Sequence, residues 1–505
     1  MSEHTSASEN PEVATTAGAV RGAWRDGSAA FLGIPFAEPP IGDLRFAAPV
    51  AHRPWEGVRD ALEYGATPQR KALSEVTLIP EPSIPGLSTL NVNVFTPSPT
   101  TPTDAGLPVL VWIHGGGYVA GSPASPWYDG AAFNRDGVVT VSVSYRLGFD
   151  GFGWIEDAPQ NRGVLDWLLA LEWVRDNIAS FGGDPSRVTL SGQSAGGGSV
   201  LTLLGMPRAQ SLFNSVISLS GPPTNVTLEA SEAVGRTLAE IAGVPATIAG
   251  LSTLPEERVL ELQGEVSSIG GDVTADGTAP ADPLAGIAGF LNAGLVLGPV
   301  VDGDLIPLAT ADALASGIGA DKHLILGTTD DEFAMMLAGA TDAMAAIPPA
   351  AVLAGIGVEP ATIEAYVADH ADLGTAALVG QYITDKMFRA PNLDLAEIRA
   401  SIGAPTWMYR FSWKSPHLGA CHCIDVPFMW DVLGDEHVPA IAGTEPPQAL
   451  ADDIHSSTVA FIATGQPGWP AYDDADRAVR VYDVPTTVLA DGYADTRSLV
   501  PVRVG

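Results

Sequence analysis

The residues best suited to nucleophilic chemistry surround Ser194, in the stretch Gly192-Gln193-Ser194-Ala195-Gly196. The apolar run 188–190 comes before this stretch and a largely apolar run, 199–204, follows it, which predicts a strand, a sharp turn and a helix. In that context a Gly-x-Ser-x-Gly turn holds a serine hydroxyl above the sheet, and the helix N-terminus offers free N–H groups to an oxyanion. With 55 glycines in the chain the pattern can also arise by chance, so the assignment depends on partners elsewhere.

A second glycine-rich stretch, His114-Gly115-Gly116-Gly117, ends another apolar run, 107–113. Three consecutive glycines let backbone N–H groups converge on one point without obstruction by side chains. At the end of a strand that precedes a nucleophile turn, such a segment completes an oxyanion hole. A generic glycine-rich turn is the alternative, which the position of the segment ahead of Ser194 disfavours.

These stretches need a sheet to position them, and the sequence predicts one. A continuous apolar run at 107–113 is typical of a parallel strand buried on both faces, and the valine-rich run 138–143 predicts another strand. A strand pair is predicted at 19–24 and 29–34, and single strands at 90–95, 323–326 and 406–413. Residues 163–180 have helical spacing of apolar side chains, and 181–185 ends that helix. This alternation predicts an α/β fold with a central, mostly parallel sheet flanked by helices.

The chain is organised as one large domain behind a short leader. Residues 1–15 are polar and predict a disordered leader, and residues 16–505 are predicted to form a single domain. Within it, residues 224–320 and 334–400 are rich in Ala, Gly, Asp and Glu. We expect helical insertions there that cover the active site.

Composition argues against several classes of partner. The formal net charge is −34 and the chain has four lysines, which argues against nucleic acid or an anionic membrane as partner. No apolar run reaches the length of a membrane span, and the polar N-terminus lacks the pattern of a secretory signal. The two cysteines, Cys421 and Cys423, are too close for a structural disulfide. These features predict a cytoplasmic protein, with a monomer preferred.

The motifs together resemble the type-B carboxylesterase family, which includes bacterial carboxylesterases and the cholinesterases. The resemblance is carried by Phe-Leu-Gly-Ile-Pro at 31–35, the His-Gly-Gly-Gly stretch, Tyr-Arg-Leu-Gly at 145–148, Phe-Gly-Gly-Asp-Pro at 181–185, the Ser194 turn and Ala-Thr-Gly-Gln-Pro at 463–467. It covers nearly the whole chain, with weaker support in the two predicted insertions. It implies the α/β-hydrolase fold and hydrolysis of carboxylic esters through an acyl-enzyme, without a cofactor.

The resemblance also implies site residues. Ser194 matches the family nucleophile, Glu332 its acid and His422 its base. The order Ser, Glu, His along the chain is also the order expected for this fold from the motif alone. The backbone donors of the oxyanion hole match Gly116, Gly117 and Ala195.

Three features depart from the family pattern. Phe333 follows the predicted acid where the family often has glycine, and Trp167 stands where it often has glutamine. Secreted relatives carry a disulfide near the N-terminus, whereas the matching positions here are Thr67 and Thr89. The loss of both cysteines together supports an intracellular protein.

Several residues keep alternative interpretations. The Cys421-His422-Cys423 loop could suggest metal ligands, but alternate residues of one short loop rarely supply a complete tetrahedral set, and we expect no metal. The acidic run 330–332 could be a solvated turn, and Asp330 and Asp331 are expected to be dispensable for activity. Walls of the substrate pocket are expected from aromatic and methionine side chains near the motifs, with the buried core as the alternative: Tyr118, Trp127, Phe333, Met335 and Trp430.

The expected substrate is a small-molecule ester. The same triad could act on a carbamate or an aryl amide, because the chemistry differs only in the leaving group and the pocket. A non-catalytic binding protein is a third interpretation, which the presence of all three triad residues disfavours.

Overall fold

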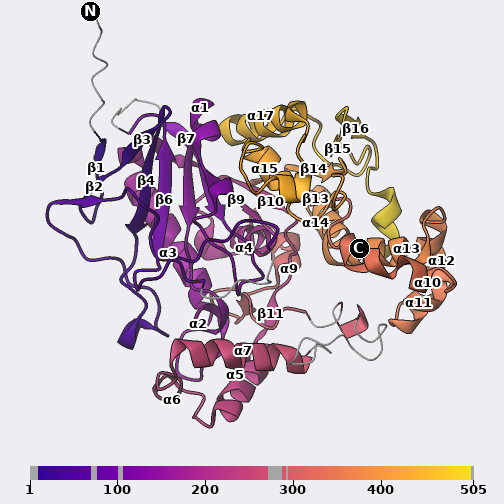
Figure 1. Ribbon diagram of the computed structural model, residues 1–505, viewed down its shortest axis with the longest axis horizontal. Coiled ribbons are helices and arrows are strands. Elements are labelled where there is room, and N and C mark those ends of the chain that lie inside the picture. The colour runs from indigo at the N-terminus through magenta and orange to yellow at the C-terminus, as the bar shows by residue number, and fades with distance from the viewer. Residues whose placement is uncertain are drawn as a thin grey trace, which may run out of the picture.

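The computed structural model describes residues 10–69, 77–99, 106–270, 287–289, 291 and 294–501, and within them an 11-stranded sheet forms the centre (Figure 1). Its strand order is β16-β15-β14-β13-β10-β9-β7-β8-β6-β4-β3. The strands span β3 Ala23–Arg25, β4 Ser28–Pro35, β6 Asn91–Thr96, β7 Leu107–Ile113, β8 Val139–Val143, β9 Gly183–Gln193, β10 Ser215–Leu219, β13 His323–Thr329, β14 Thr406–Phe411, β15 Val479–Tyr482 and β16 Thr487–Leu489.

The middle of this sheet is parallel and its edges are antiparallel. Neighbours from β8 through β7, β9, β10, β13 and β14 to β15 pair in parallel. The edge strands β16, β6, β4 and β3 pair antiparallel. The predicted α/β-hydrolase fold with a mostly parallel central sheet is therefore confirmed, and β9 begins at Gly183, several residues earlier than the apolar run 188–190 indicates.

The central strand β7 is buried on both faces, which explains its continuous apolar sequence. In β7, Val109, Val111 and Ile113 belong to one core, which contains the buried faces of α3 and α4. The alternate residues Leu110 and Trp112 belong to a second core with α15 and α17. Side chains of a strand alternate between faces, so one apolar run serves two layers of helices.

The helices of these layers flank the sheet in Figure 1. They include α1 Ala131–Arg135, α2 Gly148–Phe152, α3 Arg162–Asn177, α4 Ala195–Leu204, α9 Thr310–Ala315, α14 Ala390–Ser401, α15 Asp425–Met429, α16 Pro439–Ala442 and α17 Gln448–Thr464. Among the described residues, no helix combines the length and the apolarity that a membrane crossing requires.

Two smaller sheets accompany the central one. β1 (Glu12–Ala14) pairs with β2 (Ala19–Arg21), which also pairs with β5 (Val58–Asp60). The predicted disordered leader, 1–15, is therefore wrong over 12–14, because these residues form a strand; residues 1–9 lie outside the described part. β11 (Val226–Thr227) pairs with β12 (Val300–Val301) inside the first predicted insertion.

Apart from β11, β12 and connecting loops, the described residues of the segments predicted as insertions form helices. The first contains α5 Leu228–Ala242, α6 Ile248–Leu251 and α7 Glu256–Gly270, which group at the bottom of Figure 1. The second contains α10 Thr341–Met344, α11 Pro349–Gly355, α12 Pro360–Asp369 and α13 Thr375–Thr384, which group at the right. A π-helix, Asp385–Arg389, then leads into α14 and carries Phe388 toward the candidate site.

Candidate active site

Ser194 lies in a tight turn between β9 and α4. Its backbone angles, φ 59° and ψ −125°, are unusual for a residue with a side chain, and its N–H donates to Leu219 O at 2.9 Å. A Cβ on Gly196 would collide with the carbonyl oxygen of Ile113, and one on Gly192 with the backbone of Gly196. Only glycine fits at both positions, so the strained turn is set by local packing. The Ser194 side chain is partly exposed while its neighbours are buried.

The loop after β7 lies beside this turn. Gly116 has φ 109°, and its carbonyl accepts from Val119 N at 3.1 Å and Ala120 N at 2.9 Å, which closes the loop on itself. The N–H groups of Gly116, Gly117 and Ala195 have no acceptor within the described part of the chain. The first N–H groups of a helix lack intrahelical partners, so the α4 N-terminus supplies such a donor by its nature.

Two contacts hold the loop in place. The ring of His114 bonds to Gly115 O through Nδ1 at 2.8 Å, and burial lowers the pKa of His114 to about 4, so the ring is neutral at pH 7. The Gly121 N–H donates to Gln69 Oε1, from the loop that begins near Thr67. Two of the three backbone donors, those of Gly116 and Gly117, therefore belong to a loop whose shape is fixed before any substrate arrives, and the third begins α4.

Glu332 and His422 form the acid–base pair of the site. His422 Nδ1 lies 2.5 Å from Glu332 Oε2, and the other carboxylate oxygen accepts from Thr329 N at 2.9 Å. The His422 N–H also donates to the backbone oxygen of Glu332 at 2.9 Å. Glu332 is fully buried, and a carboxylate can only accept, so Nδ1 carries the proton and Nε2 presents a lone pair.

That lone pair faces an unexpected partner. The amide Nε2 of Gln193 lies 3.0 Å from His422 Nε2, while Ser194 Oγ has no hydrogen-bond partner among the residues that the structure describes. The sequence brings Gln193 to the site as the residue before Ser194, but the motif leaves that position unspecified. A polar side chain at the end of a buried strand is the one signal that pointed to it.

Two aromatic rings flank the imidazole. Phe333 and Phe388 each have their ring centroid 4.9 Å from that of His422, and their own centroids are 5.3 Å apart. Phe333, the departure from the family pattern after the acid, therefore packs on the base. The other departure, Trp167, is fully buried in the core against Tyr145 at 5.4 Å.

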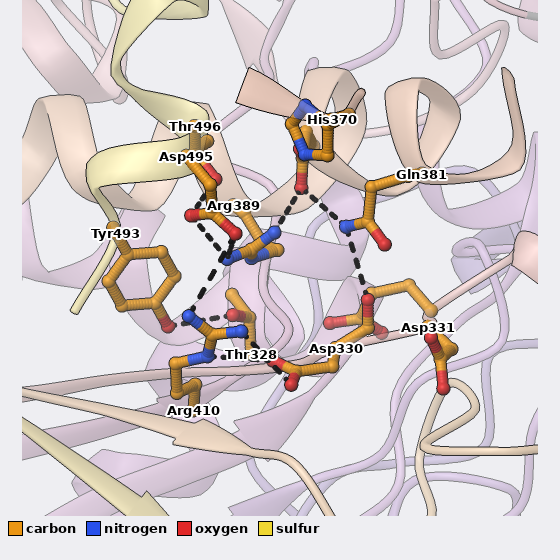
Figure 2. A network of polar contacts seen from close by, with 12 residues as sticks. Thr328, Asp330, Asp331, His370, Gln381, Arg389, Arg410, Tyr493, Asp495 and Thr496 are labelled. Atoms are coloured by element: carbon orange, nitrogen blue, oxygen red, sulfur yellow. Dashed lines mark hydrogen bonds and ion pairs between the residues drawn. The ribbon is translucent and has the colours of Figure 1, made fainter. Parts of the chain in front are cut away.

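Asp330, two residues before Glu332 in the loop after β13, belongs to a network of polar contacts (Figure 2). Arg410 makes two hydrogen bonds to its carboxylate, at 2.8 and 3.0 Å, and Gln381 on α13 donates to its backbone oxygen at 3.3 Å. Figure 2 shows the network continuing through Arg389 to Asp495. The alternative that the acidic run is a solvated turn therefore does not hold for Asp330, because its ion pair with Arg410 leaves the side chain only 13% exposed.

Asp331 also has a structural contact. Its N–H donates to Ala420 O, and its carboxylate accepts from Ala420 N, both at 2.9 Å. Lys414 Nζ lies 3.0 Å from the second carboxylate oxygen. Asp331 thus joins the loop that carries Glu332 to the loop that carries His422.

The predicted pocket walls divide into two groups. Phe333 lies at the site, and Met335 is partly buried against the second core. Trp430 packs against Trp112 at 5.4 Å, Trp127 donates to Asp435 at 3.1 Å, and both have no exposed surface. Tyr118 packs on Phe152 at 5.2 Å and is also buried. These three are core residues, which is the alternative that the sequence left open.

A cavity of about 570 Å³ borders the loop after β7. Val119 and Ala120 of that loop form one wall, and Phe149, Val259 and Leu260 contribute apolar surface from α2 and α7. None of the five predicted pocket residues lines it. The first insertion therefore encloses space one loop away from the candidate site.

The two cysteines beside His422 are poor candidates for metal ligands. Both are buried and free, and burial raises the pKa of Cys421 to about 12 and holds that of Cys423 well above its usual value. A protonated thiol does not ligate a metal. Across the described ranges, no group of three or more His, Cys, Asp or Glu side chains is arranged to hold one.

Comparison with known proteins places the chain among esterases. The model of the carboxylesterase family matches residues 9–488. A para-nitrobenzyl esterase of Bacillus subtilis is 33% identical over 506 residues, covering 96% of this chain and 97% of that one. A phenmedipham hydrolase of Pseudarthrobacter oxydans is 34% identical, covering 93% and 94%. The crystal structure of a Geobacillus stearothermophilus carboxylesterase has a TM-score of 0.81 at 29% identity and covers 97% of this chain and 100% of its own.

Proposed function

The chain belongs to the carboxylesterase family, and from that premise we propose that Ser194, His422 and Glu332 are the catalytic triad with which it hydrolyses carboxylic esters. The single observation that carries this assignment is the buried pair of His422 Nδ1 and Glu332 Oε2, 2.5 Å apart, beside the strained Ser194 turn. Hydrolysis of carboxylic esters is itself the activity of the family and of this protein.

In the proposed reaction, Ser194 Oγ attacks the acyl carbonyl and His422 Nε2 takes its proton. Glu332 keeps the Nδ1 tautomer and stabilises the imidazolium. The same proton then goes to the departing alcohol. Water, activated by His422, attacks the acyl-enzyme and releases the acid and the free serine.

The oxyanion of both tetrahedral intermediates would be bound by the N–H groups of Gly116, Gly117 and Ala195. Their lack of acceptors supports this role, since a donor already paired within the protein has to break that bond first. No cofactor takes part in the proposed steps, and the substrate is a small-molecule ester.

We assign the protein to the cytoplasm. Both cysteines are reduced, and the loop that a disulfide closes in secreted relatives is closed here by hydrogen bonds of Thr67. The Thr67 N–H donates to Ile84 O at 3.0 Å, and Thr67 Oγ1 accepts from Ile84 N at 2.9 Å. Cell fractionation with an antibody to the protein tests this, and recovery outside the cytoplasmic fraction contradicts it.

A fluorophosphonate probe tests the nucleophile. We expect one labelled serine, Ser194, and loss of both labelling and turnover of p-nitrophenyl acetate in Ser194→Ala. Ser199→Ala is a matched control, because Ser199 is five residues away on α4 and donates to Ala195 O inside the helix. Labelling at another serine, or turnover that survives in Ser194→Ala, contradicts the assignment.

The substrate class needs a separate panel. p-Nitrophenyl esters of increasing acyl length, a phenyl carbamate and phenmedipham are compared by kcat/KM under one set of conditions. We expect the esters to be preferred. A carbamate or aryl amide that exceeds every ester by tenfold or more would replace the ester assignment while leaving the triad in place.

A further inference from the structure

The hydrogen bond between Gln193 and His422 involves Nε2 of His422, the base of the proposed mechanism. His422 Nε2 has to accept the proton of Ser194 Oγ, yet the Gln193 amide occupies its lone pair at 3.0 Å. Gln193 is 2% exposed and is the last residue of β9. The contact joins residues 229 positions apart in sequence.

The direction of this hydrogen bond follows from the partner of the other ring nitrogen, Nδ1. Because Glu332 accepts the proton on Nδ1, Nε2 of the neutral ring can only accept, and the donor must be the amide N–H of Gln193. A protonated ring would present N–H at Nε2 as well, and two N–H groups cannot bond to each other. The amide in this orientation therefore favours the neutral, basic form of His422 over the imidazolium.

We propose that Gln193 is a positioning residue that holds His422 in the free enzyme as a neutral base, with its lone pair covered until the substrate arrives and Ser194 Oγ–H replaces the amide. The proposal rests on the triad assigned above and adds a residue to it. Gln193 neither attacks nor transfers a proton, and it acts only through the imidazole.

Other groups that face the imidazole have to be separated from this effect. Glu332 is bonded to Nδ1. Asp425 on α15 is also buried, and its carboxyl group interacts electrostatically with both Glu332 and His422. Burial raises the pKa of Asp425 to about 6, and its carboxylate accepts from Tyr409 at 2.7 Å. The π-helix that carries Phe388 has its buried charges paired, since Arg389 lies 2.7 Å from Asp385. Asp425 is therefore the group whose titration could mimic a change at His422.

The test is the pH dependence of two kinetic constants in Gln193→Met. Methionine has nearly the same length as glutamine but cannot donate a hydrogen bond. The acid limb of kcat/KM reports the free enzyme, and the acid limb of kcat reports the enzyme–substrate complex. We expect the midpoint of the kcat/KM limb to move to higher pH by about 0.4–1 unit, which corresponds to the net contribution of one hydrogen bond. The midpoint of the kcat limb should stay in place, because the amide has already been displaced in that complex.

A structural role alone predicts a different result. A loosened site lowers kcat at every pH and moves neither midpoint. On the plateau above both acid limbs, we expect Gln193→Met to reach at least the kcat/KM of the parent, because Ser194 no longer has to displace a donor. A kcat/KM midpoint that does not move, or an equal movement of both midpoints, overturns the proposal.

Three controls complete the design. Gln193→Ala repeats the measurement with a second side chain that cannot donate. Gln210→Met changes a glutamine that donates to the carbonyl oxygens of Leu204 and Met206 away from the site, and its midpoints should equal those of the parent. The midpoint shift caused by Gln193→Met should be the same in the Asp425→Asn background as in the parent, which excludes Asp425 as its source.

A crystal structure of the parent protein without substrate provides a measurement that needs no variant. We expect Gln193 Nε2 to be closer to His422 Nε2 than Ser194 Oγ is. The reverse order overturns the proposal even if the variants do not fold. Failure of the triad itself is seen separately, as labelling or turnover that survives in Ser194→Ala.

Discussion

Replacing Asp330 by asparagine should destabilise the protein although the residue takes no part in the proposed chemistry. The carboxylate makes two hydrogen bonds to Arg410, and the side chains of Asp330 and Arg410 are only 13% and 19% exposed. Asparagine keeps the shape but leaves the guanidinium without its nearest counter-charge. Breaking a buried pair in this way costs about 3–5 kcal/mol in the free energy of unfolding.

Two features of the structure lower that figure. The pair keeps some contact with water, and Arg410 retains Asp495 at 4.0 Å and the carbonyl oxygen of Gly492 at 2.6 Å. We therefore expect Asp330→Asn to lose about 2–3 kcal/mol, below the range for a fully buried pair. Because Glu332 keeps its own contacts, kcat should remain within about tenfold of the parent.

The loss should depend on pH in a defined direction. Burial alone would raise the pKa of Asp330, but the charges of Arg410 and Arg389 and hydrogen bonds from Arg410 and Ser412 outweigh it and hold the pKa below its usual value. A lowered pKa in the folded state gives stability that is fully present above the unfolded value, about 3.9, and is lost as the pH falls through the folded value. The parent and Asp330→Asn should thus differ most near pH 7 and converge below about pH 4.

Urea unfolding followed by tryptophan fluorescence measures this difference. Asp176→Asn is the matched control, since Asp176 pairs with Arg175 through side chains that are 48% and 50% exposed, and such surface pairs contribute at most about 1 kcal/mol. If Asp330→Asn unfolds at the same urea concentration as Asp176→Asn, the Asp330–Arg410 pair is not desolvated as the structure indicates, and the reasoning is refuted.

Two further predictions concern the site itself. Glu332→Gln should lower kcat for p-nitrophenyl acetate by roughly 10²- to 10⁴-fold, because an amide can favour the wrong tautomer of His422 and removes the counter-charge bonded to the imidazolium; a loss below tenfold would remove Glu332 from the triad. Prolonged dialysis against EDTA should leave kcat unchanged, because burial keeps the Cys421 thiol protonated. An enzyme that EDTA inactivates and zinc restores would instead favour the Cys421-His422-Cys423 metal site.

The fold could be predicted because each strand of a parallel sheet carries its own signal. A strand buried on both faces can be apolar at every position, so β7 is visible as an uninterrupted run, while β8 is marked by its alternating valines. The Ser194 turn is visible for a related reason, since only glycine fits where the backbones of β9 and α4 approach each other. The leader was misplaced because β1 is short and gains its stability from pairing with β2, which leaves no local pattern.

Roles of side chains around the site were harder to predict. Aromatic residues near the motifs could line a pocket or fill the core, and only the packing of Trp430 on Trp112 separates the two. Asp330 and Asp331 are charged residues in a loop, for which water is the usual environment. Their partners, Arg410 and Ala420, come from segments about 80–90 residues away.

By itself the sequence determined the sheet, the glycine turn and the family, because these depend on residues that are neighbours along the chain or on patterns that repeat within one strand. Only the tertiary structure decided what His422 touches: Glu332 on one nitrogen, Gln193 on the other, and two phenylalanine rings on its faces. Those contacts arise at the carboxyl ends of central strands, where β9, the end of β13 and the loop after β14 come together. The direction of a hydrogen bond between residues 229 positions apart depends on that convergence, and no local pattern encodes it.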